Sequence, residues 1–201
     1  MGDGMNSAAN EQTGGATSPI VLIVMGVSGC GKTTVAALLA GRLGWRFQEG
    51  DALHPPANVD KMRHGVPLND ADRLPWLDSI GALIDRWSAE GASGIITCSA
   101  LKRAYSERIR AGRPAVEFIF LRGARELVSA RLARRSGHYM PASLLASQFE
   151  ALEEPGADEP VIAVDIGGSP DQIVEAILSS SRFQRRRPRP PPARPADERG
   201  A

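Results

Sequence analysis

Short apolar runs alternate along the chain with segments in which apolar residues recur every three or four positions. Residues 20–25 form a continuous apolar run, as expected for a strand that is buried on both faces of a sheet. The further segments that predict strands are residues 46–49, 94–99, 116–121 and 161–166. Turn residues bound most of these segments, which supports five separate strands.

Helical spacing fills the intervals between the strands. Val35, Leu38, Leu39 and Leu43 lie on one face of a helix that begins at residue 34, and Gly44 ends it. The other predicted helices span residues 72–87, 102–111, 124–135, 143–152 and 169–178, the last beginning at Ser169 or Asp171. Strands that alternate with helices predict an α/β fold, in which a parallel five-stranded sheet carries helices on both faces.

A glycine-rich loop joins the first strand to the first helix. Its sequence is Gly26-Val27-Ser28-Gly29-Cys30-Gly31-Lys32-Thr33, which fits the P-loop pattern G-x-x-x-x-G-K-[ST] in its strand–loop–helix context. The glycines let backbone N–H groups point into one concavity, and the helix adds the positive end of its dipole. A turn that merely connects strand and helix is the alternative, and the lysine and both flanking elements argue against it. The residues expected to bind a nucleotide are Gly26, Val27, Ser28, Gly29, Cys30, Gly31, Lys32, Thr33 and Thr34.

Composition adds the domain boundaries. The 201-residue chain is 42% apolar and 23% charged, which is ordinary for one globular domain. We expect a flexible leader over residues 1–18, a P-loop domain over residues 19–181 and a disordered Arg/Pro-rich tail over residues 182–201. The tail concentrates the positive charge, so the domain itself is nearly neutral and gives no reason to expect nucleic acid as its partner. Weak anchoring of an acidic partner remains an alternative role for the tail.

The sequence also bears on the cellular location. No apolar run approaches the ~18 residues that span a bilayer, and no basic segment followed by an apolar core opens the chain. Cys30 and Cys98 have neither a metal-binding nor a redox spacing. We therefore expect a cytoplasmic protein without a membrane partner.

Phosphoryl transfer needs a metal ion, an oriented nucleophile and cations for the developing charge. Lys32 is placed to reach the β- and γ-phosphates, and the Thr33 hydroxyl is a candidate ligand of Mg²⁺. The strand at residues 94–99 ends without an acid, whereas Asp51 follows the strand at residues 46–49. We expect that strand to neighbour the P-loop strand, so that Asp51 faces the γ-phosphate as a general base or a metal ligand. A simple turn-forming role is the alternative for Asp51.

Candidate cations lie at the end of the helix predicted over residues 124–135. Arg131, Arg134 and Arg135 are spaced so that one helical face presents all three, and His138 follows in a Gly-containing loop. This pattern fits a lid over about residues 122–142 that closes on the phosphates. A solvated basic face fits the same spacing, so both interpretations stay open.

Several further motifs, in order along the chain, resemble the bacterial gluconate kinase family. They are Phe-Gln-Glu-Gly-Asp-Ala-Leu-His-Pro from Phe47, Asn-Val-Asp-Lys-Met from Asn58, Gly-Val-Pro-Leu-Asn-Asp-Ala-Asp-Arg-Leu-Pro-Trp-Leu from Gly65, Cys-Ser-Ala-Leu-Lys-Arg-Ala-Tyr from Cys98, Arg-Ser-Gly-His-Tyr-Met from Arg135 and Ser-Gln-Phe-Glu-Ala-Leu-Glu-Glu-Pro from Ser147. The likeness covers about residues 20–166. Glu49 departs from it, because the family usually has Asp there, and Tyr139 stands where Phe is frequent.

The resemblance implies a P-loop kinase fold similar to shikimate and nucleoside-monophosphate kinases. It implies phosphorylation of D-gluconate by ATP with Mg²⁺, which feeds sugar-acid catabolism through the pentose phosphate or Entner–Doudoroff route. Dimers are common among such relatives, so a homodimer is expected. The catalytic residues would be Lys32, Asp51, Arg131 and Arg135, with Thr33 and Asp51 on the metal.

A sugar acid carries a carboxylate and several hydroxyls, so its pocket needs cations together with hydrogen-bond donors and acceptors. The candidate substrate-binding residues are Asp51, His54, Lys61, Asp70, Arg73, Ser99, Lys102, Arg103, Arg134 and His138. Lys102 and Arg103 begin a predicted helix, whose N–H groups would favour an anion. His54 and Lys61 also suit a turn cap and a solvated surface. Asp165 and Arg131 are placed near the adenine by position only, Gln148 is expected at the base of the lid, and Trp76 is expected in the core.

Three functions are weighed. The first is a gluconate kinase, and the second is a related kinase that acts on shikimate or another small alcohol. The third is a nucleotide-bound switch whose basic tail recruits an acidic partner or RNA. The full set of motifs favours the first.

Overall fold

A five-stranded parallel sheet with helices on both faces forms the protein, which confirms the predicted fold class. The computed structural model describes residues 18–134 and 142–187. The strand order is β2-β3-β1-β4-β5. The strands are β1 (Val21–Met25), β2 (Arg46–Glu49), β3 (Gly94–Cys98), β4 (Val116–Arg122) and β5 (Val161–Asp165). All neighbouring strands pair in parallel, so their carboxyl ends share one edge of the sheet.

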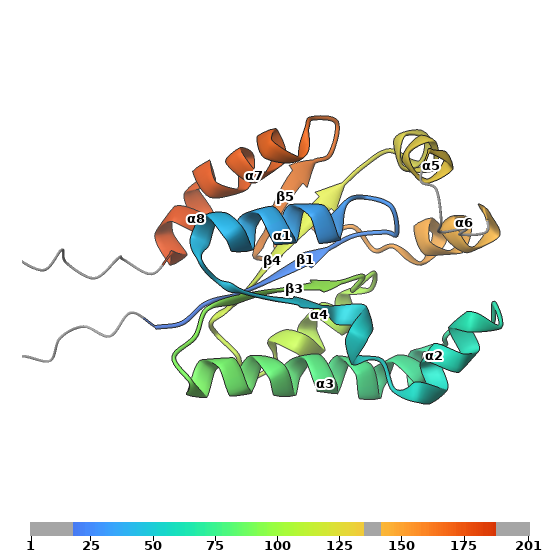
Figure 1. Ribbon diagram of the computed structural model, residues 1–201, viewed down its shortest axis with the longest axis horizontal. Helices are drawn as coiled ribbons and strands as arrows, with labels where there is room; N and C mark the ends of the chain where they lie inside the picture. Colours follow the sequence, from blue (N-terminus) through green and yellow to red (C-terminus); the bar gives the residue numbers. More distant parts are fainter. Residues whose placement is uncertain (1–17, 135–141, 188–201) are drawn as a thin grey trace, which may run out of the picture.

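Helices enclose this sheet in two layers (Figure 1). The helices α1, α7 and α8 lie on one face, and α3 and α4 lie on the other. The helical elements are α1 (Lys32–Leu43), the 3-10 helix η1 (Gly50–Leu53), α2 (Pro56–Arg63), α3 (Asp70–Ala89), α4 (Arg103–Arg110), α5 (Arg125–Ala133), α6 (Ala142–Ala151), α7 (Pro170–Ser179) and α8 (Ser181–Arg186). Among the residues described, no helix is both long enough and apolar enough to cross a membrane.

Strand β1 shows why its sequence is apolar at every position. Leu22 and Val24 belong to the core beneath α1 and α7, whereas Val21, Ile23 and Met25 belong to the core beneath α3. Successive side chains of a strand point to opposite faces, so a central strand between two helical layers needs apolar residues throughout. This burial fixes the position of the P-loop, which follows Met25 directly.

Helix α3 begins two residues before the predicted start. The side chain of Asn69 accepts a hydrogen bond from the backbone N–H of Asp72, and the carboxylate of Asp72 accepts one from the N–H of Asn69. This reciprocal capping satisfies two N–H groups that a helix start otherwise leaves unpaired. The helix is therefore anchored firmly where it approaches the carboxyl edge of the sheet.

The disordered tail was predicted to begin at residue 182, several residues before the end of the last helix. Residues 182–186 belong to α8, so the prediction of disorder from residue 182 is wrong for this segment. Phe183 is only 1% exposed and packs into the core, and Arg182 and Arg186 bond to the buried carboxylate of Glu117. Residues 1–17 and 188–201 lie outside the described residues.

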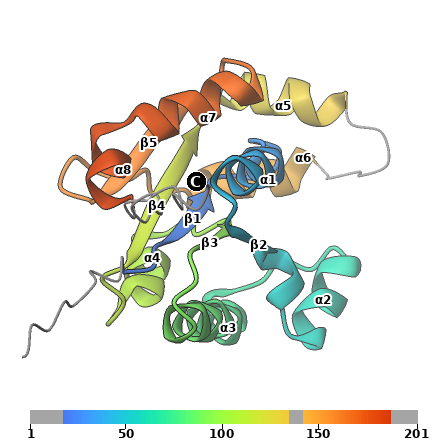
Figure 2. The same cartoon turned by 60° about the vertical axis from the view of Figure 1, so that its left-hand side comes forward.

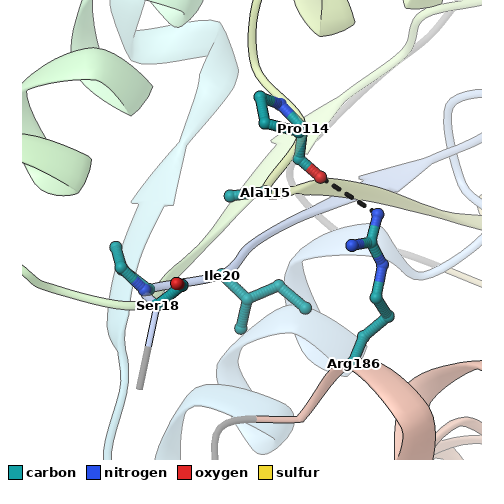
Figure 3. Close-up of a pocket in the computed structure, with 6 residues that line it drawn as sticks. Ser18, Ile20, Pro114, Ala115 and Arg186 are labelled. Carbon is teal, nitrogen blue, oxygen red and sulfur yellow. Dashed lines mark hydrogen bonds between the residues drawn. The ribbon is translucent and has the colours of Figure 1, made fainter. Parts of the chain in front are cut away.

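The two edges of the sheet differ in their surroundings. Figure 2 shows α2 on one side and α5 and α6 on the other at the carboxyl edge, where the P-loop lies. At the amino edge, a pocket of about 230 Å³ is lined by Ser18, Pro19, Ile20, Pro114, Ala115 and Arg186. Figure 3 shows Arg186 beside Pro114 there, with its Nη2 donating to the carbonyl oxygen at 3.0 Å. This pocket lies opposite the P-loop and is not part of the nucleotide site.

Candidate functional site

The P-loop, residues 26–33, depends on glycine at three positions. Gly26, Gly29 and Gly31 have φ angles of 141°, 82° and 101°, a region that residues with a side chain rarely adopt. A Cβ at Gly29 would lie 2.6 Å from Cγ of Leu132, so α5 packs directly on the loop. Among the described residues, no side chain caps the N-terminus of α1, whose N-cap residue is Gly31, so its first N–H groups remain available to phosphate oxygens.

Two polar groups of the P-loop are bonded to acceptors of the chain itself. The Nζ of Lys32 donates to the carbonyl oxygens of Gly26 and Val27, at 3.0 and 3.1 Å. The backbone N–H of Ser28 donates to Oε1 of Gln148 on α6, at 2.7 Å. These acceptors are neutral, and the oxygens of a phosphate form stronger charge-assisted bonds with the same donors. The loop is thus shaped for an anion before one binds.

Asp51 lies in η1, at the carboxyl end of β2, and its side chain is exposed. The expectation that β2 neighbours the P-loop strand is wrong, because β3 lies between β2 and β1. Two strand spacings separate the two strands, roughly 10 Å. Burial raises the pKa of Cys98, at the end of β3, to about 12. The charges of Asp51, Lys32 and Arg73 also influence this pKa. The acid and the P-loop lysine therefore act on the same end of the sheet.

The backbone before Asp51 is fixed by a close contact with Thr97 and by two hydrogen bonds. A Cβ at Gly50 would lie 1.8 Å from the carbonyl oxygen of Thr97, so only glycine fits there. The N–H of Gly50 donates to Oγ1 of Thr97 at 3.1 Å, and Nε1 of Trp76 donates to the carbonyl oxygen of Gly50 at 2.7 Å. Trp76 is 1% exposed, which confirms its prediction as a core residue. This residue nevertheless contributes to the site, because it fixes the loop that carries Asp51.

Glu49 is tied to β3 by one carboxylate oxygen. Its Oε2 accepts a hydrogen bond from Oγ1 of Thr97 at 2.5 Å, and its Oε1 is buried without a partner among the described residues. Within the same part of the chain, no three His, Cys, Asp or Glu side chains are grouped as a metal site. The hydroxyl of Thr33 and the carboxylate of Asp51 are hard oxygen donors that suit Mg²⁺, which commonly takes few protein ligands and completes its shell with phosphates and water.

Charged groups from α3 and α4 meet at the same edge. Nζ of Lys102 lies 2.8 Å from the carboxylate oxygens of Asp70, and the hydroxyl of Tyr105 donates to Asp70 at 2.6 Å. These hydrogen bonds from Lys102 and Tyr105 hold the pKa of Asp70 below its usual value. The guanidinium of Arg73 lies 5.9 Å from the centre of the Tyr105 ring. Sequence reasoning assigned roles to the three charged residues but none to Tyr105, which joins them.

His54 precedes α2, and Lys61 lies on this helix. The ring of His54 stacks on that of Trp76 with 4.2 Å between ring centres and 14° between their planes. Burial lowers the pKa of His54. The negative charge of Asp51 opposes this shift, whereas the positive charge of Arg73 adds to it. Nζ of Lys61 lies 2.6 Å from Oδ1 of Asp72, so this cation links α2 to α3.

Arg103 and Ser99 have other partners than expected. The guanidinium of Arg103 pairs with Glu107 at 2.9 Å and with Asp158 at 3.1 Å. Its backbone N–H, at the start of α4, donates to Oε2 of Glu153 at 2.7 Å. A carboxylate of the chain thus occupies this N–H, and a substrate anion would have to displace Glu153 to use it. Ser99 joins the loop instead, since its carbonyl oxygen accepts from the N–H of Gly26 at 3.4 Å.

The cations predicted for the lid are described only in part. Nη2 of Arg131 donates to the carbonyl oxygen of Ile166 at 2.6 Å, and its Nη1 lies 4.0 Å from the position of a Cβ on Gly31. Arg131 therefore lies against the P-loop. Arg134 ends α5 and is exposed. Arg135 and His138 lie outside the described residues.

Asp165, which was assigned to the adenine by position, ends β5. Its Oδ1 accepts a hydrogen bond from the N–H of Gly167 at 2.7 Å and so shapes the turn that follows the strand. The carbonyl oxygen of Ile166 in the same turn accepts the hydrogen bond of Arg131. This turn is thus joined to the P-loop through Arg131.

Comparison with known proteins places this geometry in context. Residues 22–191 match the model of the ATPase family associated with various cellular activities (AAA). A gluconokinase from Gluconobacter oxydans (strain 621H) is 54% identical over 164 residues, which cover 80% of this chain and 90% of that protein. The crystal structure of a gluconokinase from Sinorhizobium meliloti 1021 superimposes with a TM-score of 0.75 at 41% identity, over 84% of this chain and 94% of that one.

The fold extends to more distant kinases. The crystal structure of shikimate kinase from Aquifex aeolicus vf5 superimposes with a TM-score of 0.53 at 18% identity, over 79% of this chain and 94% of that one. Identity at this level indicates a shared fold and carries no further argument about chemistry.

Proposed function

The chain belongs to the gluconokinase family of P-loop proteins, and we propose that it transfers the γ-phosphoryl group of ATP to D-gluconate. The products are ADP and 6-phospho-D-gluconate. The observation that carries this proposal is the meeting of the P-loop, Asp51 and the charged groups of α3 and α4 at one edge of the sheet. A phosphate donor and a polar acceptor can therefore bind side by side.

The P-loop binds the phosphates of ATP in this proposal. The N–H groups at the start of α1 donate hydrogen bonds to phosphate oxygens, and Lys32 exchanges its two carbonyl partners for the β- and γ-phosphates. Thr33 and Asp51 would hold Mg²⁺, which neutralises charge on the phosphates when bound. Arg131 lies against the loop and adds a cation that the transition state favours.

Asp51 is the proposed general base. As a gluconate hydroxyl oxygen attacks the γ-phosphorus, the new P–O bond forms, the bond to the β-phosphate oxygen breaks, and the hydroxyl proton passes to Asp51. The bonds that hold Gly50 to Thr97 and Trp76 support this role, because they fix the backbone that carries the carboxylate. Such fixed geometry keeps donor and acceptor aligned.

The remaining polar groups recognise the sugar acid. Cationic Lys61, Arg73 and Lys102 suit its carboxylate, whereas His54, Asp70 and Ser99 offer hydrogen bonds to its hydroxyls. Arg103, Arg134, Arg135 and His138 complete the proposed set. Lys61 and Lys102 already pair with carboxylates, so substrate binding must share or exchange those bonds. A polyol with one carboxylate matches this mixture of charges better than a neutral alcohol does.

The assembly and location of the protein are part of the same proposal. We infer a homodimer in the cytoplasm, as the family resemblance implies. Light scattering after size-exclusion chromatography tests the dimer, and a mass of one chain would contradict it.

A coupled ADP-release assay tests the activity. Gluconate, shikimate, AMP and other sugar acids are each supplied with ATP and Mg²⁺, and gluconate is expected to give the highest kcat/KM. Stimulation by shikimate or AMP alone would overturn the proposal in favour of a related kinase. Absence of turnover with every acceptor would favour a switch, which salt-sensitive RNA binding lost on deletion of residues 182–201 would support.

A further inference from the structure

Asn58 is the buried residue of α2, with only 4% of its surface exposed. It lies between the loop that carries His54 and the start of α3. Its Nδ2 donates to the carbonyl oxygen of Asp72 at 2.7 Å and lies 3.3 Å from Nδ1 of His54. One amide nitrogen thus contacts both the backbone of α3 and a candidate substrate-binding side chain.

The carbonyl of Asp72 fixes which way the amide of Asn58 points. A backbone carbonyl oxygen only accepts hydrogen bonds, so the amide group beside it must be the NH₂. The reverse orientation would bring two acceptor oxygens to 2.7 Å from each other. The second hydrogen of the NH₂ then faces His54, so Nδ1 of His54 must be the acceptor and carries no hydrogen. In the neutral ring, the hydrogen is therefore on Nε2.

His64, at the other end of α2, provides an internal contrast. Its Nδ1 lies 2.7 Å from the carbonyl oxygen of Asp60, which can only accept. Nδ1 of His64 must therefore carry a hydrogen. The two described histidines have opposite assignments at the same ring position, which makes the inference for His54 measurable against a neighbour.

The ring of His54 is also fixed in place. It stacks on Trp76, which in turn donates to the carbonyl oxygen of Gly50 next to Asp51. The charged groups that act on the ring are Asp51 from η1 and Arg73 from α3. An N–H donor on the ring of His54 complements Asp51, whose ionised carboxylate can only accept hydrogen bonds.

We propose that Asn58 is a positioning residue of the sugar-acid site, which holds His54 in the form with its hydrogen on Nε2. The ring then offers a hydrogen-bond donor to an oxygen of the sugar acid. In the other form, Nε2 would present a lone pair and repel a carboxylate. This inference rests on the proposed function for its substrate, but the state of the His54 ring can be measured without any substrate.

Nuclear magnetic resonance of the ¹⁵N-labelled full chain at pH 8 reads the ring nitrogens directly. The expected spectrum has His54 protonated at Nε2 and His64 protonated at Nδ1, with His54→Gln and His64→Gln supplying the assignments. Asn58→Asp replaces the NH₂ by an acceptor of similar shape, so Nδ1 of His54 should become protonated. A wild-type His54 with its hydrogen on Nδ1, or an unchanged ring in Asn58→Asp, would overturn the proposal.

A matched control separates this effect from looser packing of α2. The ion pair of Lys61 with Asp72 also joins α2 to α3, and Lys61→Ala removes it. Both hydrogen bonds of Asn58 are left in place by this change. The ring of His54 should keep its hydrogen on Nε2 in this variant. A shift of that hydrogen to Nδ1 in Lys61→Ala would show that packing, and not Asn58, sets the form of the ring.

Kinetics then test the consequence for the substrate. In Asn58→Asp and in Asn58→Leu, which lacks both donor and acceptor, KM for gluconate should rise about threefold to tenfold through the lost hydrogen bond. The KM for ATP should stay unchanged, which shows that the variants are folded. An unchanged KM for gluconate would contradict the positioning role. Failure of the wild-type protein to phosphorylate any sugar acid would instead overturn the proposed function, while the assigned form of His54 would stand.

Discussion

The two edges of the sheet use the same kinds of charged residue in opposite ways. At the amino edge, the carboxylate of Glu117 is 1% exposed and is bonded by Arg182 and Arg186. At the carboxyl edge, Lys32 rests on two neutral carbonyl groups, and Asp51 is exposed without a salt bridge within residues 18–134 and 142–187. Charge at the first edge is matched within the fold, whereas the charges of Lys32 and Asp51 at the second edge are left for a ligand.

This difference indicates where changes affect stability and where they affect activity. A buried carboxylate is tolerated only when it is paired, so the amino edge should respond to substitution with lost stability. The fold gains little from the unpaired charges of Lys32 and Asp51, so substitutions of these two residues should leave the fold intact and remove function. Four changes test this contrast, in order of expected effect.

Lys32→Ala should have the largest effect. Loss of the cation proposed to bind the β- and γ-phosphates should lower kcat/KM by about 10³–10⁵-fold, the range known for a cation that stabilises phosphoryl transfer. ATP affinity, measured by calorimetry, should fall as well. Arg42→Ala removes a cation of the same helix that pairs with Asp171 and Glu175, and it should retain both properties. Equal losses in the two variants would contradict the account.

Asp51→Asn should separate binding from chemistry. Without a base, kcat should fall about 10²–10⁴-fold, while calorimetry should give an unchanged ATP affinity. Asp60→Asn, on the exposed side of α2, is the control and should keep its turnover. Normal turnover in Asp51→Asn would remove the proposed base.

The double variant Arg182→Ala/Arg186→Ala should affect the opposite property. Both partners of a buried carboxylate are lost, which should cost about 3–5 kcal/mol of unfolding free energy. Chemical denaturation measures this loss, and activity per folded molecule should be unchanged. Adding Glu117→Gln to the double variant removes the unpaired charge and should recover part of the stability. No recovery would indicate that the helix α8, and not the buried charge, accounts for the loss.

Tyr105→Phe should have the smallest effect. It removes one hydrogen bond to Asp70, which should raise KM for gluconate about threefold. Burial, together with the hydrogen bond to Asp70, raises the pKa of Tyr105 to about 12. Its contribution to stability is thus complete below pH ~10, where an unfolded tyrosine titrates, and is lost as the pH rises towards 12.

Phenolate absorbance checks this assignment, because the chain has only two tyrosines. One of the two steps in the titration should lie near pH 12 in the wild type and disappear in Tyr105→Phe. Retention of that step would assign it to Tyr139.

The strands and the P-loop could be predicted because their signals are local. β1 is apolar at all five positions, and the loop pattern from Gly26 to Thr33 is contiguous. The order of the strands has no such signal, so Asp51 was expected one strand too close to the P-loop. Helix α8 was missed because its contacts are distant in the sequence, since Arg182 bonds to Glu117, which is 65 residues away.

The candidate site shows the same division between local and distant signals. Lys32 belongs to the contiguous P-loop pattern and Asp51 lies two residues after β2, so both could be named from the sequence. Helix α2 has no apolar periodicity, since its buried side chain is the polar Asn58. His54 lies only four residues before Asn58, but the carbonyl of Asp72, 14 residues after it, is brought near by the fold alone. The roles of Trp76 and Tyr105 likewise depend on partners that the fold alone brings near.

The most direct test of the central claim is identification of the product. The protein is incubated with ATP, Mg²⁺ and D-gluconate, and ³¹P nuclear magnetic resonance follows the phosphorus atoms. The account predicts one new phosphate monoester, coupled to the two protons of the terminal carbon, in equal amount with ADP and absent with Asp51→Asn. Formation of free phosphate alone, or an undiminished monoester signal with Asp51→Asn, would contradict it.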